Sequence, residues 1–198
     1  NKNIFYGLIE LRVLNMDENS IEFLNSDVFE YLSKLKTIHL QYNLLRIIHK
    51  DNFIYLNQID HIFLMYQKIR QLENFSFTNL KMVNMISLEG NFLTKISNFT
   101  LVNLTNLNFL FIHNNQIKII ELNSFLNIPN LIEIHLKNNR LEKLNENFLI
   151  NIPNVRKVDL SMNSISNIVN NFFGNCRYLE YLDISNNKLY ALDRETFI

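Results

Sequence analysis

Apolar residues recur along this chain in a fixed frame that opens with a short, strict alternation. One copy of the frame, from residue 131, reads LIEIHLKNNRLEKL, with apolar side chains at its first, fourth and sixth positions. Alternation with a period of two is typical of a short β-strand with one buried face. In the copy that starts at residue 59, Ile62 and Leu64 are therefore expected to point inward. The residues between and beside them are expected to face solvent, namely His61, Phe63 and Met65.

The frame recurs eight times at a period of 24 residues without insertion or deletion, with copies starting near residues 11, 35, 59, 83, 107, 131, 155 and 179. Such a period indicates a solenoid, because one unit cannot bury its apolar face alone whereas stacked neighbours can. Residues 1–198 are thus expected to form a single array. We also expect an uncapped fragment of a longer array, since Phe5 and Leu8 fit the tail of a preceding copy and the last copy stops at Phe197.

Two further columns of residues have structural explanations. An asparagine occupies the ninth position of every copy except the third, where Gln67 replaces it. An amide there can satisfy buried backbone N–H and C=O groups of a sharp turn, as donor and as acceptor. Because the glutamine side chain is longer, a local bulge is predicted in the third repeat. The other side of each coil is filled by a second column: Phe29, Phe53, Phe77, Leu101, Phe125, Leu149, Phe173 and Phe197.

The consensus LxxLxLxxNxLxxLxxxxFxxLxxL resembles the leucine-rich repeat family, in the 24-residue form typical of extracellular arrays. The resemblance covers essentially the whole chain. It implies an α/β repeat solenoid, a leucine-rich repeat horseshoe with a parallel concave β-sheet and an irregular or short-helical convex side. Toll-like receptor ectodomains, Slit-like proteins and insect immune or adhesion proteins use this form. The sequence does not contain their usual cysteine-rich caps, so it does not distinguish among them.

Composition narrows the classes of partner. A formal net charge of zero argues against electrostatic capture of nucleic acid or of an anionic membrane surface. No apolar run approaches the roughly 20 residues that span a bilayer, so no membrane insertion is expected in this segment. The single cysteine, Cys176, stands at a buried leucine position. It is expected to be a small buried hydrophobic residue rather than a reactive thiol.

The residues that the scaffold does not require indicate where a partner binds. Repeats three to five place phenylalanine and methionine at solvent-facing strand positions, and strands about 4.8 Å apart would join them into one apolar patch with a polar rim. Such a patch is typical of a binding surface. The alternative is that a phenylalanine-rich chain shows phenylalanine here as it does everywhere. The predicted partner-binding residues are His61, Phe63, Met65, Met85, Glu89, Phe109, Phe111, His113, Glu133 and His135.

Other candidate chemistry is weaker. Asp159 and Asp183 would lie on neighbouring strands, but an aspartate two residues before a serine is common at this place in the family, which favours a structural role. His113 and His135 could approach within about 8 Å across adjacent strands. No third ligand is apparent, so neither a metal nor a cofactor is expected, while a pH-sensitive partner contact remains open. The chain shows no constellation of nucleophile, base and oxyanion donors, so enzymatic activity is not expected.

Three glycosylation sequons begin at Asn74, Asn98 and Asn103, all outside the predicted strands. Asparagine is so abundant that such sequons arise by chance, so they are compatible with secretion without demonstrating it. The leading hypothesis is an extracellular recognition module, secreted or part of a receptor ectodomain, that binds a protein or glycoconjugate in immunity, signalling or adhesion. The array could also dimerise. The alternative is an intracellular scaffold or regulatory subunit built on the same repeat.

Overall fold

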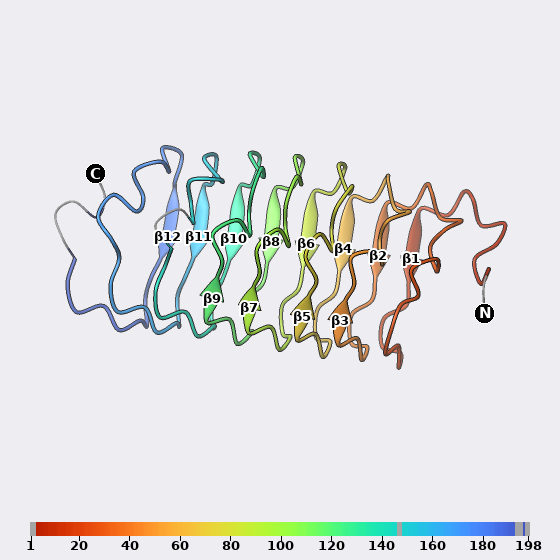
Figure 1. The fold of residues 1–198 in the computed structure, drawn as a ribbon, viewed down its shortest axis with the longest axis horizontal. Helices are drawn as coiled ribbons and strands as arrows, with labels where there is room; N and C mark the ends of the chain where they lie inside the picture. Colours follow the sequence, from red (N-terminus) through yellow and green to blue (C-terminus); the bar gives the residue numbers. More distant parts are fainter. Residues whose placement is uncertain (1–2, 146–147, 193–195, 197–198) are drawn as a thin grey trace.

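A computed structural model describes residues 3–145, 148–192 and 196. Eight strands, one from each repeat, lie side by side in one parallel sheet (Figure 1). Each strand covers the third to fifth positions of its repeat, and neighbours pair without a shift in register. The predicted parallel sheet and solenoid are therefore confirmed. The strands are β1 Val13–Asn15, β2 Thr37–His39, β4 His61–Phe63, β6 Met85–Ser87, β8 Phe109–Phe111, β10 Glu133–His135, β11 Lys157–Asp159 and β12 Tyr181–Asp183.

The rest of each coil is irregular, as the resemblance implies. Two short parallel sheets lie in it: β3 Ile47–Ile48 pairs with β5 Gln71–Leu72, and β7 Lys95–Ile96 pairs with β9 Ile119–Ile120 (Figure 1). Turns make up most of the remaining backbone, and no α-helix occurs within residues 3–145 and 148–192. Over the same residues, no helix therefore has the length and apolar character that a bilayer crossing needs.

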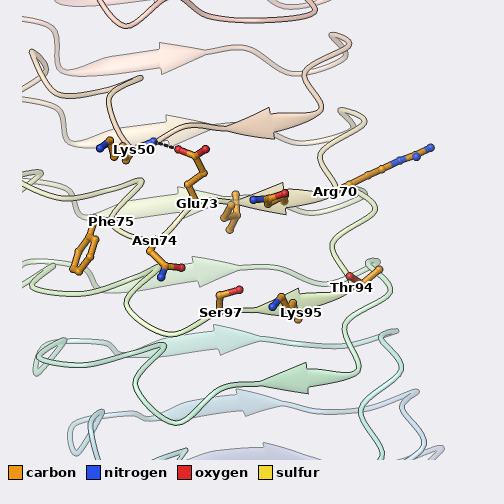
Figure 2. Close-up of a pocket in the computed structure, with 10 residues that line it drawn as sticks. Lys50, Arg70, Glu73, Asn74, Phe75, Thr94, Lys95 and Ser97 are labelled. Carbon is orange, nitrogen blue, oxygen red and sulfur yellow. Dashed lines mark hydrogen bonds between the residues drawn. The ribbon is translucent and has the colours of Figure 1, made fainter.

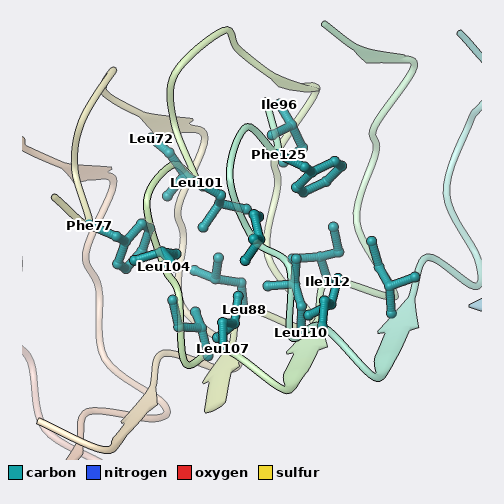
Figure 3. Packing of buried hydrophobic residues seen from close by; sticks show 14 of the residues in the cluster. Leu72, Phe77, Leu88, Ile96, Leu101, Leu104, Leu107, Leu110, Ile112 and Phe125 are labelled. Atoms are coloured by element: carbon teal, nitrogen blue, oxygen red, sulfur yellow. The ribbon is translucent and has the colours of Figure 1, made fainter. Parts of the chain in front are cut away.

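The interior is a stack of equivalent apolar layers, one from each repeat. Side chains from successive coils pack against one another in columns between the sheet and the returning chain (Figure 3). The phenylalanine column is buried as predicted, and Phe53 stacks between Phe29 and Phe77 with ring centroids 6.2 and 5.8 Å apart. Its last predicted member, Phe197, lies outside the described residues. Cys176 is buried, which raises the pKa of its thiol to about 11 and confirms that it is a small hydrophobic residue.

The asparagine ladder makes the contacts predicted for it. Asn115 Oδ1 accepts a hydrogen bond from the backbone N–H of Leu93 in the preceding repeat at 3.0 Å. Its Nδ2 donates to the carbonyl of Leu88 in the preceding repeat at 3.0 Å, and to the carbonyl of Ile112 in its own repeat at 3.1 Å. Each amide therefore closes its own turn and also joins two consecutive coils.

The bulge predicted at the third repeat is wrong. Strand β4 has the same length as its neighbours and pairs with β2 and β6 in an unbroken register. Gln67 Oε1 accepts the N–H of Leu45 at 3.0 Å, and Gln67 Nε2 donates to the carbonyl of Leu40. The carbonyl of Leu64 accepts from Asn91 at 2.9 Å. The longer side chain thus reaches the preceding repeat without displacing the backbone.

The residue before each ladder amide has a left-handed backbone conformation in all eight repeats. These residues, with φ between 51° and 66°, are Glu18, Tyr42, Tyr66, Gly90, Asn114, Asn138, Met162 and Asn186. Glycine adopts this conformation freely and asparagine tolerates it, whereas a bulky side chain costs about 1–2 kcal/mol. The turn therefore favours glycine or asparagine, and Tyr42 and Tyr66 are the least expected occupants of the column.

Candidate functional site

The predicted partner-binding residues lie together on the solvent-facing side of four adjacent strands. The register places His61, Met85, Phe109 and Glu133 in one row across β4, β6, β8 and β10. A second row contains Phe63, Ser87, Phe111 and His135. Met65, Glu89 and His113 follow the strands as a third row, two positions further along each repeat. We call these three rows the concave surface.

The apolar residues of the concave surface are less exposed than the sequence led us to expect. Each of them is half-buried, and the buried Ser87 lies between Phe63 and Phe111. Two of the three phenylalanine rings pack on imidazoles of adjacent strands: Phe63 stacks on His39 at 4.7 Å, and Phe111 contacts His135 at 4.9 Å between ring centroids. These contacts form two aromatic clusters on the concave surface, one of His39 with Phe63 and one of Phe111 with His135.

A network of ionisable groups surrounds the second cluster. His113 Nε2 lies 2.9 Å from Glu89 Oε2, and His135 Nε2 lies 3.1 Å from Glu133 Oε2. Lys157 Nζ approaches the same Glu133 oxygen at 3.6 Å. The two imidazole centroids are 6.2 Å apart, within the separation expected from the sequence. Burial lowers the pKa of His113, although the nearby carboxylate of Glu89 opposes this effect.

We expect this arrangement to make the stability of the protein pH-dependent below about pH 6.5. A lowered native pKa means that the unfolded chain binds a proton on His113 more readily than the folded chain does, so the free energy of unfolding rises with pH through this window. Chemical denaturation at a series of pH values would measure the slope. His113→Gln should flatten it, whereas His49→Gln, an exposed control, should not. Identical pH profiles for wild type and His113→Gln would contradict the assignment.

The paired aspartates have structural partners. Asp159 Oδ1 accepts from the N–H and the hydroxyl of Ser161 at 3.0 and 2.6 Å. Asp183 Oδ1 accepts the N–H of Ser185 at 2.9 Å, and hydrogen bonds from this serine lower the pKa of Asp183. Each carboxylate therefore closes its own turn. Within the part of the chain that the structure describes, no cluster of three or more histidine, cysteine, aspartate or glutamate side chains could hold a metal ion.

Figure 2 shows a hollow outside the concave surface that the repeat pattern did not predict. It has a volume of about 660 Å³ and lies between β5 and β7, where the two short sheets are not joined. The cause is local: Glu73 and Glu121 accept backbone N–H groups of Lys50 and Asn98 at 3.0 and 2.8 Å. Ser97, at the equivalent place between them, has too short a side chain for this contact. The replacement of glutamate by serine at residue 97, between Glu73 and Glu121, was the signal in the sequence that could have indicated this hollow.

The cations around this hollow do not converge on one point. Arg70 extends away from the other side chains, while Lys50 and Lys95 lie on opposite sides of the hollow (Figure 2). Lys95 Nζ is 3.4 Å from Glu121 Oε1, and the carboxylate of Glu73 already accepts the backbone N–H of Lys50 and contacts the His49 imidazole. The hollow is thus a polar gap in the solenoid wall, with less candidate chemistry than the concave surface.

Comparison with known proteins agrees with this architecture. No curated protein sequence matches the chain significantly. Among solved structures, the TLR13–ssRNA13 complex matches with a TM-score of 0.88 and 26% identity over 93% of this chain. The LRIM1/APL1C complex matches with a TM-score of 0.80 and 23% identity over 95%, and the Toll–Spatzle complex of Drosophila with 0.74 and 23% over 95%. The latter two establish the fold alone.

This chain spans only 26%, 33% and 28% of those three solved chains, respectively. The family model described as leucine rich repeat matches residues 9–69 and 153–198, just over half of the chain. The unmatched middle has the same strands, register and ladder amides as the matched ends. The chain therefore belongs to the leucine-rich repeat family.

Proposed function

We propose that this chain is an extracellular recognition module, within a secreted protein or a receptor ectodomain of immunity, signalling or adhesion. It binds a protein or glycoconjugate partner through the concave surface. One observation supports this most: the outward strand positions of repeats three to six hold aromatic and ionisable side chains that the scaffold does not use. The inward-facing residues of the strands already build the core, and the ladder amides already join the coils in register.

The geometry of the concave surface suits recognition rather than catalysis. The rings of Phe63 and Phe111 are already held by contacts with neighbouring imidazoles, so they would lose little side-chain freedom on binding. Half-buried aromatic groups flanked by charged ones are typical of binding hot spots. The carboxylates of Glu89 and Glu133 add directional polar contacts beside them.

The structural relatives are consistent with a recognition role and broaden the range of partners. One is a complex with ssRNA13, and the other two are complexes between proteins. The expectation that nucleic acid is excluded is therefore not supported by the comparisons. We retain a protein or glycoconjugate as the proposed partner because the chain has zero net charge and its concave surface includes Glu89 and Glu133.

Replacing both Phe63 and Phe111 with serine is expected to weaken partner binding at least about 30-fold, since removal of a hot-spot aromatic typically costs 2 kcal/mol or more. Screening the protein against arrayed ectodomains, glycans and RNA oligonucleotides would identify the partner, and titration of the variant would measure the loss. The thermal midpoint should change little, because both rings are only half-buried.

The matched control is the pair Phe23→Ser and Phe92→Ser. Both of these rings are exposed, at 70% and 43%, and lie outside the concave surface. Equal affinity of the Phe63/Phe111 variant and wild type would refute the concave-surface proposal. Specific capture of RNA through the same residues would show that the partner class is wrong.

The three sequons differ in their surroundings. Asn74 is exposed, and its side-chain amide makes no hydrogen bond to any described residue. Asn98 Oδ1 accepts the N–H of Asn123 at 3.0 Å, and Asn103 Oδ1 accepts from Asn127 at 2.9 Å. We expect a complex glycan on Asn74, seen as a mass decrease when protein from its native source is treated with a glycosidase. An unmodified Asn74 together with a cytoplasmic location would favour the intracellular scaffold.

A further inference from the structure

A pair of tyrosines at the turns beside the concave surface is not explained by the fold. Tyr42 and Tyr66 occupy the left-handed column, where four of the other six repeats have glycine or asparagine and the remaining two have Glu18 and Met162. Neither ring is in the core, since the two side chains are 52% and 41% exposed. Strained conformations persist where the surrounding structure over-determines them, and they cluster at functional sites. The choice of tyrosine therefore points to a role outside folding.

The two rings are fixed in one arrangement. They stack with centroids 4.9 Å apart and planes 7° from parallel. The far face of Tyr66 lies over Gly90, where an added Cβ would be 2.4 Å from Cδ1 of the ring. The nearby Glu89 carboxylate raises the pKa of the Tyr66 phenol. Gly90 thus lets the Tyr66 ring lie flat, and that ring supports Tyr42.

The remaining face of Tyr42 is turned toward the first repeat, where Glu18 occupies the same column. The backbone N–H of Glu18 donates to the carbonyl of Gln41 at 2.9 Å, and that of Tyr42 donates to the carbonyl of Met65 at 3.1 Å. The backbone hydrogen bond from repeat one to repeat two is thus equivalent to the one from repeat two to repeat three. Glu18 therefore comes next to Tyr42 in the column, just as Tyr42 comes next to Tyr66. An exposed glutamate thus comes next in the column on the open side of the aromatic stack.

The charged residues at the seventh and eighth positions of the repeats that carry the stack are all acidic. The seventh and eighth positions of repeats one to four include three carboxylates and no lysine or arginine: Asp17, Glu18, Gln41, Tyr42, Met65, Tyr66, Glu89 and Gly90. Asp17 Oδ1 accepts the backbone N–H of Gln41 at 2.8 Å, which fixes that carboxylate at the edge of the stack. The face of a tyrosine ring attracts a cation, and a nearby carboxylate strengthens that preference.

We propose that Tyr42, Tyr66 and Glu18 form a docking surface for a basic segment of a partner protein, with an arginine guanidinium seated between the Tyr42 ring and the Glu18 carboxylate. A planar guanidinium fits this slot, because it stacks on a ring and forms paired hydrogen bonds to a carboxylate at the same time. Lysine satisfies only the charge. Phosphate-bearing ligands are disfavoured by the three carboxylates. This surface lies at the turns and adjoins the concave surface through Glu89, which belongs to the third row of that surface.

Ring-labelled tyrosine NMR tests the proposal, with a capped arginine-containing hexapeptide and matched lysine and citrulline peptides as probes. The signals of Tyr42 and Tyr66 should shift with the arginine peptide, less with the lysine peptide, and not with the citrulline peptide. Tyr42→Asn should weaken arginine-peptide binding about tenfold, and Glu18→Gln several-fold. Tyr42→Phe should retain binding, since the ring face remains.

Controls separate this surface from the fold and from the concave surface. Asparagine tolerates the left-handed turn, so Tyr42→Asn should keep or raise the thermal midpoint. Tyr190→Asn, at a tyrosine that is 78% exposed, should leave peptide binding unchanged. The Phe63→Ser/Phe111→Ser variant should also bind the peptide normally, so failure of one proposal does not imply failure of the other. Equal binding by Tyr42→Asn or by the citrulline peptide would overturn the inference, as would the same ring shifts with a neutral oligosaccharide.

Discussion

Phe53→Ala is expected to lower the free energy of unfolding by about 3–5 kcal/mol, the range for deleting a buried phenylalanine from a core that relaxes only in part. The Phe53 ring is 1% exposed and stacks on both neighbours in its column, Phe29 and Phe77. Removing it leaves a cavity in the middle of a continuous stack. Because each coil contacts only its neighbours, the loss concentrates in repeats one to three.

Urea denaturation of wild type and variant would measure the change, and hydrogen exchange would show whether it is confined to those repeats. Phe53→Leu is the matched control, since Leu101 and Leu149 are buried at the same place in other repeats. The leucine variant should lose much less stability than the alanine variant. If the two variants were equally stable, the argument from column packing would fail.

Asn115→Ala is expected to cost about 1–3 kcal/mol, the penalty for one buried polar group left without a partner. Although the Asn115 amide makes several hydrogen bonds, most of the carbonyls it reaches have a second donor. The Leu88 carbonyl also accepts from Asn91 at 2.9 Å, and the Ile112 carbonyl also accepts from Asn139 at 3.1 Å. The N–H of Leu93 has no such alternative and becomes the orphaned group.

Asn115→Asp separates the role of the amide N–H donors from that of the amide oxygen acceptor, because aspartate has nearly the same shape but no N–H group. The carboxylate still accepts from Leu93 but faces the carbonyl oxygens of Leu88 and Ile112, so this variant should be less stable than Asn115→Ala at neutral pH. Protonating the aspartate should recover part of the loss, because the buried charge is removed. Thermal melts at neutral and acid pH would measure both effects. An unchanged melting curve for Asn115→Ala would contradict the ladder argument.

The fold could be predicted from the sequence because its information is periodic and local. The alternation places Ile62 and Leu64 inward, and the amide at the ninth position of each repeat fixes the turn. The bulge predicted at Gln67 was wrong, because the longer side chain does not lengthen the turn. The side chain reaches the preceding repeat and leaves the strand register intact, a contact that involves residues 22 positions apart.

The candidate site was predicted only in outline. The alternation correctly placed Phe63 and Phe111 on the solvent side of their strands, and the period placed His113 beside His135. It did not reveal that each phenylalanine would pack on an imidazole and become half-buried. Nor did it single out Tyr42 and Tyr66, because residues beyond the strand have no alternation from which their exposure follows.

The sequence by itself determined the repeat, the position of each strand, the buried columns and the role of the ladder amides. These follow from one 24-residue unit and from the requirement that stacked units bury apolar side chains and pair backbone groups. Only the tertiary structure decided how side chains of neighbouring repeats meet at the surface: the two aromatic clusters, the gap at Ser97 and the Tyr42–Tyr66 stack over Gly90. The physical reason is that surface contacts depend on the rotamers and backbone conformations of adjacent coils together, which no single copy of the repeat specifies.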